Sequence, residues 1–177
     1  RYKITVIGLD KVDQEAGGMI VLPNHPAEVD PVILGLSFWK KARLRPVADE
    51  GFYHMPIINK GFKLVNTIPM PDLRSGAGYF KRLRIKKTMQ HISQSLQSGD
   101  NILLYPSGHL TRTGREIIGG SSATAQLINE VPTAQIILVK TTGLWGSSFS
   151  TAQTAGATPD LFKSFKKALF SIAKNLI

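Results

Sequence analysis

Cysteine is absent from the 177 residues of this sequence. Its absence excludes disulfides, cysteine nucleophiles and thiolate-held metal sites, and it fits a reducing compartment. Long hydrophobic runs are absent as well. The longest strongly apolar stretches, residues 101–105 and 134–139, are far shorter than the roughly 20 residues that a membrane-spanning helix needs. We therefore expect no membrane-spanning segment, and no stretch has the pattern of a secretory signal peptide.

Acidic residues are scarce: 12 Asp and Glu stand against 22 Lys and Arg, which gives a net charge of +10. Clustered basic residues attract polyanions, so nucleic acid, anionic lipid headgroups and an acidic carrier protein are all compatible partners on charge alone. The clusters lack the interleaved aromatic residues of single-strand binders, which disfavours nucleic acid. They comprise Lys40, Lys41, Arg43 and Arg45; Lys81, Arg82, Arg84, Lys86 and Lys87; and Lys163, Lys166 and Lys167.

Two further absences narrow the chemistry. The four histidines lack close ligand spacing such as H-E-x-x-H, so we expect no metal site. The sequence also lacks a G-x-S-x-G elbow, which argues against a serine hydrolase. His91 lies in a helical pattern with polar neighbours and is expected at the surface.

The length suits one domain, residues 1–177, and the Arg1 start and apolar end suggest a piece of a longer protein. Apolar runs alternate with helix-period segments, which predicts an α/β fold with a central mixed, mostly parallel sheet flanked by helices. The predicted strands are residues 2–7, 19–22, 45–48, 64–68, 101–105 and 136–140. The predicted helices are residues 31–40, 55–62, 79–97 and 121–129.

Residues 159–177 form a further candidate helix, because their apolar residues fall on one helical stripe with lysines interspersed. Two interpretations stay open for this basic amphipathic segment. It docks on the domain core with a solvated basic face, or it contacts a membrane surface.

The segment that carries chemistry is residues 24–31, directly after the predicted strand 19–22. His25 should emerge at the strand end, and Asp30 should cap the next helix, with Pro31 in its first turn. The turn between them can bring the two side chains together. An imidazole can take a proton from an alcohol, and a carboxylate on its other nitrogen fixes the tautomer and stabilises the imidazolium. The pair is therefore a candidate general base with an orienting partner.

Residues 24–30 resemble the N-H-x-x-x-x-D signature of the lysophospholipid and glycerol-phosphate acyltransferase family. The resemblance implies catalytic roles for His25 and Asp30 and a substrate-binding role for Asn24. A second block, residues 50–61 with Glu50, Pro56 and Gly61, resembles the part of the family that helps form the acceptor pocket. The family arginine that meets the acceptor phosphate is missing there, and Arg74 is the nearest basic residue.

A third block, residues 104–112, resembles the family's F-P-E-G-T-R-S loop after a buried strand. Ser107 stands where the family has a glutamate that helps hold the acceptor, so acceptor identity can differ here. Gly108 lets backbone approach a ligand, His109 is a candidate pocket residue, and Arg112 or Arg115 could bind an anionic group.

A fourth block, residues 131–139, resembles the segment of the family that lines the acyl site. The whole resemblance covers about residues 18–143. Residues 141–149 are also similar to a branch of the family in which this domain is joined to an acyl-activating ligase.

The resemblance implies transfer of a fatty acyl group from a thioester of acyl carrier protein or coenzyme A to a hydroxyl of a lysophospholipid or glycerol phosphate. It implies no bound cofactor, because the thioester is a co-substrate, and no acyl-enzyme intermediate. The expected partners are the lipid acceptor, the thioester donor and a membrane contacted peripherally on its inner, cytoplasmic face. The alternative is a non-catalytic module of the same fold that binds lipid or acyl carrier protein, which Ser107 and the altered second block favour.

Overall fold

The chain forms a five-stranded sheet in a computed structural model that describes residues 3–13, 18–72, 78–118, 122–160, 163, 164 and 166. The strand order is β3-β2-β4-β1-β5, and every pairing between neighbours is parallel. The predicted α/β class is therefore confirmed, whereas the expected mixture of strand directions is not found. The strands are β1 (Met19–Pro23), β2 (Leu44–Asp49), β3 (Ile68–Met70), β4 (Asn101–Leu103) and β5 (Gln135–Val139).

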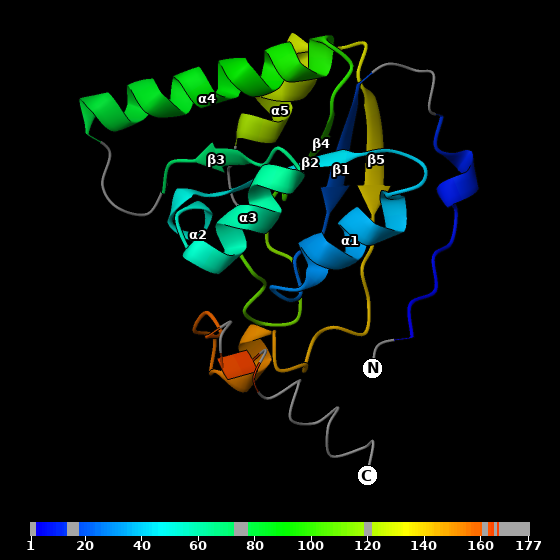
Figure 1. The fold of residues 1–177 in the computed structure, drawn as a ribbon, viewed down its shortest axis with the longest axis vertical. Helices are drawn as coiled ribbons and strands as arrows, with labels where there is room; N and C mark the ends of the chain where they lie inside the picture. Colours follow the sequence, from blue (N-terminus) through cyan, green and yellow to red (C-terminus); the bar gives the residue numbers. More distant parts are fainter. Residues whose placement is uncertain are drawn as a thin grey trace.

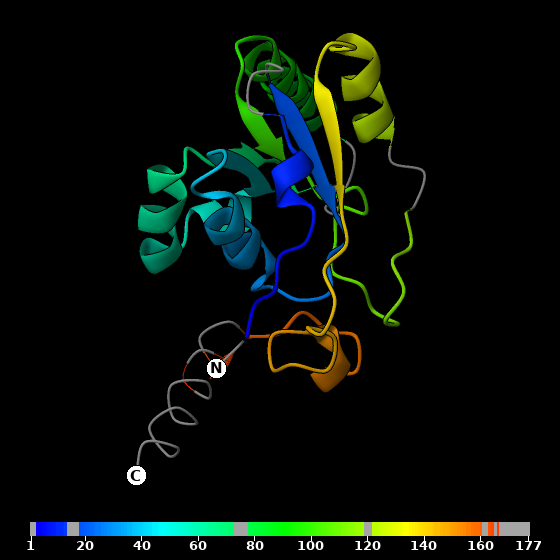
Figure 2. The same cartoon turned by 90° about the vertical axis from the view of Figure 1, so that its right-hand side faces the viewer.

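Helices cover both faces of this sheet (Figures 1 and 2), as an all-parallel sheet requires. The α-helices are α1 (Asp30–Phe38), α2 (Glu50–Tyr53), α3 (Pro56–Leu64), α4 (Tyr79–Gln97) and α5 (Ser122–Glu130). Short 3-10 turns are η1 (Leu9–Lys11) and η2 (Thr151–Gln153). Successive residues of β1 point to opposite faces and enter two different cores. Ile20 and Leu22 pack with α4 and α5, whereas Met19 and Val21 pack with α1.

The entry to β1 requires a glycine. A Cβ atom on Gly18 would lie 2.3 Å from the carbonyl oxygen of Leu96 and 2.8 Å from that of Asp100. This close approach lets the C-terminal end of α4 pass directly next to the start of β1.

Two predicted strands are wrong. Residues 3–7 form no strand, and Ile4, Val6 and Ile7 are exposed, because an apolar alternation yields a strand only where a neighbouring strand takes its hydrogen bonds. The strand predicted at 64–68 begins only at Ile68. Residues 65–67 instead close α3 with backbone hydrogen bonds, and Asn66 adopts a φ of 51°.

The predicted helix 159–177 lies almost wholly outside the described residues. In the described part of the chain, no helix combines the length and the apolar character needed to cross a membrane.

Candidate active site

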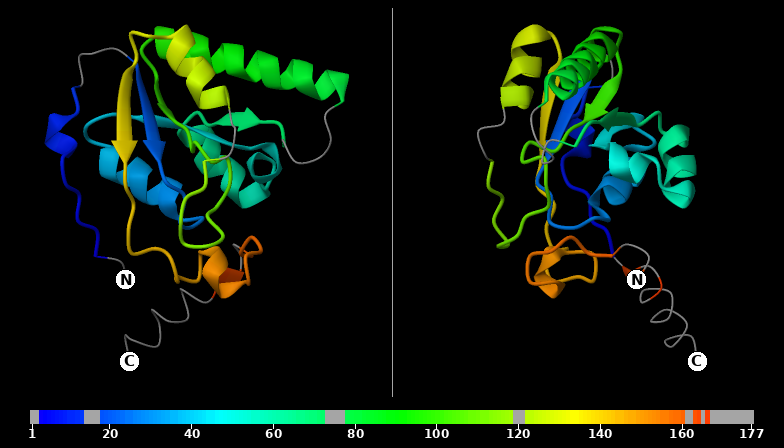
Figure 3. Two further views of the ribbon diagram at one scale, coloured as in Figure 1. Left: turned by 180° about the vertical axis from the view of Figure 1, so that it is seen from behind. Right: turned by 90° about the vertical axis from the view of Figure 1, so that its left-hand side faces the viewer.

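Three neighbouring strands deliver their carboxyl ends to one edge of the sheet, where ligands bind in parallel α/β folds. β1 runs into Asn24 and His25, and β4 runs into residues 104–118. β5 runs into residues 140–158, which lie beneath the strand ends (Figure 3). The site is built from these three connections and the first turn of α1.

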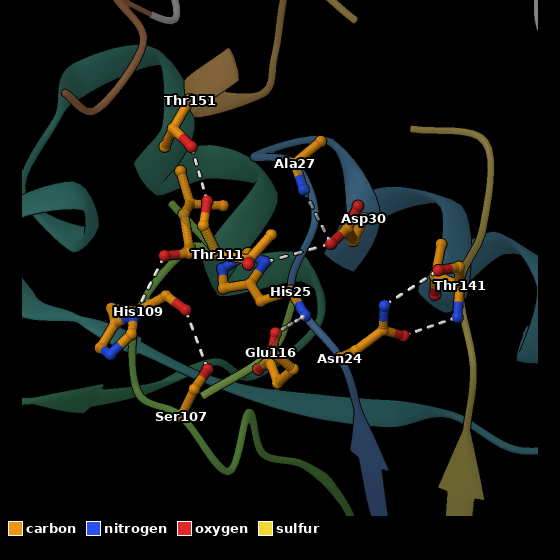
Figure 4. A network of polar contacts seen from close by, with 11 residues as sticks. Asn24, His25, Ala27, Asp30, Ser107, His109, Thr111, Glu116, Thr141 and Thr151 are labelled. Carbon is orange, nitrogen blue, oxygen red and sulfur yellow. Dashed lines mark hydrogen bonds and ion pairs between the residues drawn. The ribbon is translucent and has the colours of Figure 1, made fainter. Parts of the chain in front are cut away.

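His25 and Asp30 lie together, as the spacing predicted. The Nδ1 atom of His25 is 3.1 Å from Oδ2 of Asp30 (Figure 4), and their side chains are 13% and 0% exposed. Oδ2 also accepts the backbone N–H of Ala27 at 3.2 Å. The capping prediction for Asp30 is wrong, because Val29 is the N-cap residue and Asp30 is the first residue of α1. Its carboxylate is thus turned away from the helix and toward the imidazole.

This arrangement sets the tautomer of the imidazole. A carboxylate only accepts hydrogen bonds, so Nδ1 of neutral His25 carries the hydrogen and Nε2 carries the lone pair. Nε2 makes no hydrogen bond with any described residue. The ring also stacks on Tyr105, with centroids 3.9 Å apart and planes inclined by 25°. His25 is therefore oriented to accept a proton at Nε2.

The backbone of His25 is fixed by the connection after β4. The N–H of Thr111 donates to the carbonyl of His25 at 2.9 Å. The N–H of His25 donates to Oε2 of Glu116 at 3.2 Å (Figure 4). Both peptide groups of the base are consequently held by a segment more than eighty residues away in sequence.

Asn24 joins the ends of β1 and β5. Its amide nitrogen donates to the carbonyl of Thr141 at 2.9 Å, and its amide oxygen accepts the N–H of Thr141 at 2.6 Å. Both polar atoms of the amide thus take part in contacts within the protein. The structure places Asn24 as a clamp between two strand ends.

Comparison with known families identifies the chain. A family model described as Acyltransferase matches residues 3–176. The chain belongs to the acyltransferase family. This confirms the family suggested by residues 24–30, and it supports acyl transfer as the general activity. No curated protein and no solved structure matches the chain.

The acyltransferase carries its third sequence block as a tight loop beyond β4. The hydroxyl of Ser107 donates to the carbonyl of His109 at 2.9 Å, and Gly108 adopts a φ of 66°. Nδ1 of His109 donates to the carbonyl of Leu110 at 3.0 Å. Arg112 is exposed and forms no hydrogen bond or ion pair with the described chain. Arg115 is exposed as well, so both arginines named for this loop present their guanidinium groups to solvent.

A wall of the site comes from the residues after β5. Leu144 and Phe149 form a buried cluster with Ala27, and the N–H of Glu28 donates to the carbonyl of Phe149 at 2.9 Å. The hydroxyl of Thr151 donates to the carbonyl of Thr111 at 2.5 Å. This segment therefore braces the loop that carries His25 and the loop that follows β4.

Negatively charged side chains lie near His25. Burial raises the pKa of Asp30; the hydrogen bond and charge of His25 oppose this shift, while Glu116 adds to it. The pKa of Tyr105 is raised well above its usual range by burial and then by the charges of Asp30, Glu28 and Glu116. Three carboxylates thus lie close enough to act on Tyr105, the ring that stacks on His25.

Several buried polar atoms near His25 lack partners among the described residues. They are Oδ1 of Asp30, the hydroxyl of Tyr105, Oε1 of Glu116 and Oγ1 of Thr141. Such atoms are costly to bury and are uncommon in folded proteins. Their concentration at one edge of the sheet is typical of a functional site.

Other predicted residues lie apart from this constellation. Gly61 is exposed inside α3, and no hydrogen bond among the described residues links α3 to the loop of His25. Glu50, expected in the acceptor block, begins α2 and pairs with Arg84 of α4. Arg74 lies outside the described residues. No group of three His, Asp or Glu side chains within the described ranges could hold a metal ion.

Sequence reasoning missed Tyr105, Glu116 and Thr141. Tyr105 lies inside the third block, residues 104–112. Its place in that block is the signal that could have pointed to it. Glu116 is 91 residues from His25, and Thr141 is 117 residues from Asn24. No local spacing could have connected these pairs.

Proposed function

We propose that this acyltransferase moves a fatty acyl group from a thioester to a hydroxyl of a lysophospholipid or glycerol phosphate, with His25 as the general base. The observation that carries the proposal is the His25–Asp30 pair, held at 3.1 Å with Nε2 of His25 unpartnered among the described residues. A base so oriented can accept a proton from an acceptor hydroxyl.

In this mechanism, Nε2 takes the hydroxyl proton while the acceptor oxygen forms a bond with the thioester carbonyl carbon. The tetrahedral intermediate then collapses and breaks the carbon–sulfur bond. The proton passes from the imidazolium to the leaving sulfur, which regenerates the base. Asp30 stabilises the imidazolium and keeps the ring oriented. The reaction uses the thioester as co-substrate and needs neither a bound cofactor nor an acyl-enzyme.

The proposal extends to location and partners. The net charge of +10 suits acyl carrier protein as donor and anionic lipid as environment. The exposed guanidinium of Arg112, in the loop beyond β4, is suited to an acceptor phosphate. We place the domain at the inner, cytoplasmic face of a membrane, and we assign it to the branch joined to acyl-activating ligases.

The test is acyl transfer from labelled long-chain thioesters of acyl carrier protein and coenzyme A to a panel of lysophospholipids and glycerol phosphate. His25→Ala should lower the rate on the order of 10²- to 10⁴-fold. His91→Ala, an exposed histidine on α4, is the matched control and should keep the wild-type rate. Both variants are checked for folding by circular dichroism.

Two outcomes would contradict the proposal. A folded His25→Ala variant within threefold of the wild-type rate would remove His25 from the chemistry. A folded wild-type chain that makes no product with either donor, yet binds acyl carrier protein or lipid, would establish the non-catalytic binding module instead.

A further inference from the structure

The outward side of α1 carries an apolar stripe. Val32 is 56% exposed, Leu36 is 66% exposed, and Trp39, directly after the helix, is 38% exposed. Spacings of four and three residues place these side chains on one helical face. The stripe spans about 10 Å at the helical rise of about 1.5 Å per residue. We call these three residues the α1 stripe.

The α1 stripe is not part of the core. The opposite side of the helix buries Leu34 and Phe38 against β1 and β4. Residues 31–39 contain no charged side chain, although the outside of a surface helix is normally polar. Between the stripe residues, the space outside Gly35 is open. A row of exposed apolar residues on an uncharged helix indicates a surface that contacts another apolar phase.

Positive charge lies at the C-terminal end of the α1 stripe. Lys40 and Arg43 are exposed, and the guanidinium carbon of Arg43 lies 3.5 Å from the centre of the Trp39 ring. A tryptophan at the border between apolar and basic groups is typical of helices that lie in the headgroup region of anionic membranes. Each basic residue near such a surface is attracted to anionic lipid. Charge and apolar pattern together therefore favour a bilayer as the occupant.

The α1 stripe is also close to the candidate active site in sequence and in space. α1 begins at Asp30, the partner of His25, and Val32 follows two residues later. Figure 1 shows α1 as the helix that leads away from the end of β1 on one side of the sheet. A bilayer on the outer side of α1 would lie next to the site that consumes its lipids.

We propose that the α1 stripe, with Lys40 and Arg43, docks the domain on the surface of an anionic bilayer. The proposal rests on the proposed function for its choice of lipid as substrate, but docking is measured without catalysis. The probe is a set of vesicles of phosphatidylcholine with or without phosphatidylglycerol, and the readout is the fraction of the chain that sediments with them. Activity is recorded separately, so a loss of docking and a loss of chemistry are distinguishable.

Leu36→Gln should lower the partition coefficient on phosphatidylglycerol vesicles about tenfold, which corresponds to about 1.4 kcal/mol of apolar transfer free energy. The matched control is Leu64→Gln, at a leucine of α3 that is 75% exposed, and it should partition like the wild type. A second readout uses Trp145→Phe, which leaves Trp39 as the sole tryptophan. Lipids with brominated acyl chains should quench the fluorescence of Trp39 in that variant.

Unchanged partition of Leu36→Gln, or an equal loss in Leu64→Gln, overturns the proposal. Absence of Trp39 quenching in a vesicle-bound chain overturns it as well, since the chain would then be bound through another surface. A sedimentation mass that shows a dimer in the wild type and a monomer in Leu36→Gln would make a second copy the occupant in place of the bilayer.

Discussion

Asp30→Asn should make the acyltransferase less active and its fold more stable. The asparagine side-chain oxygen can still accept the hydrogen bonds that Oδ2 of Asp30 takes from His25 and Ala27. What the substitution removes is a negative charge at a side chain with 0% exposure. The variant therefore separates the charge of Asp30 from its shape and hydrogen bonding.

The loss of activity follows from the role of the carboxylate. Without its charge, the imidazolium that forms during proton transfer loses its stabilising partner, although the hydrogen bond at Nδ1 is kept. We expect the rate to fall on the order of 10²- to 10⁴-fold, which is about 3 to 5 kcal/mol of transition-state free energy at 1.36 kcal/mol per factor of ten.

The gain in stability follows from the raised pKa of Asp30, whose main cause is burial. A carboxyl with a raised pKa holds its proton more tightly in the folded state than in the unfolded chain. It therefore stabilises the fold below its ordinary pKa of 3.8, and this stability is lost as pH rises through the raised value. Asparagine undergoes no such loss. The difference in melting temperature between the variant and the wild type should therefore increase in favour of the variant between pH 4 and pH 8. A difference of 1 kcal/mol in the free energy of unfolding corresponds to about 2–4 °C.

The assays are thermal unfolding across this pH range and acyl transfer at neutral pH. Asp49→Asn is the control, because Asp49 caps α2 through its side chain and asparagine caps a helix equally well. A folded Asp30→Asn variant with a rate within threefold of the wild type would refute the need for the charge. A melting temperature below that of the wild type at every pH would refute the argument that the buried carboxylate is destabilising.

Two further substitutions test the surroundings of the base. Tyr105→Phe keeps the ring stacked on His25 and removes a buried hydroxyl that has no described partner, so kcat should stay within about threefold and the melting temperature should not fall. Tyr105→Leu removes the aromatic stack and should lower kcat about tenfold with little change in KM; equal rates for the two variants would show that stacking is irrelevant. Asn24→Ala removes both amide hydrogen bonds to Thr141 and should cost roughly 2 kcal/mol, or about 4–8 °C in melting temperature. An unchanged melting temperature would contradict the clamp.

The sheet was largely predictable because its strands are short apolar runs, of which β1 is buried along its whole length. β1 and β5 begin and end within one residue of the predicted ranges, and α4 matches residues 79–97. The prediction for residues 2–7 failed because alternation alone does not show whether a partner strand is present. The strand at 64–68 was misplaced because the turn that ends α3 is set by backbone hydrogen bonds from residues 65–67, which leave no signal in hydropathy.

In the candidate site, too, the contacts between residues close in sequence could be predicted and the long-range contacts could not. His25 and Asp30 are five residues apart, so a strand followed by a helix start is enough to bring them together. The contacts that fix the base are non-local: Glu116 takes its N–H and Thr111 reaches its carbonyl. These pairings depend on β4 being inserted between β2 and β1, which is a property of the sheet order and not of any segment. The His25–Asp30 pair could therefore be predicted from the sequence, whereas the contacts that hold the backbone of His25 could not.

The net charge of the chain is positive, whereas the charges near the candidate site are negative. The chain as a whole carries +10, a charge that attracts anionic partners. At Tyr105, which stacks on His25, the acting charges are however those of Asp30, Glu28 and Glu116. In the proposed mechanism, carboxylates there would stabilise the positive charge that the imidazole gains during proton transfer and would repel an acceptor phosphate. We therefore expect an acceptor phosphate to be bound by a cation away from these carboxylates, such as the exposed Arg112 in the loop beyond β4. In the proposed acceptors we therefore expect the reacting hydroxyl to lie at His25 while the phosphate of the same molecule extends toward Arg112.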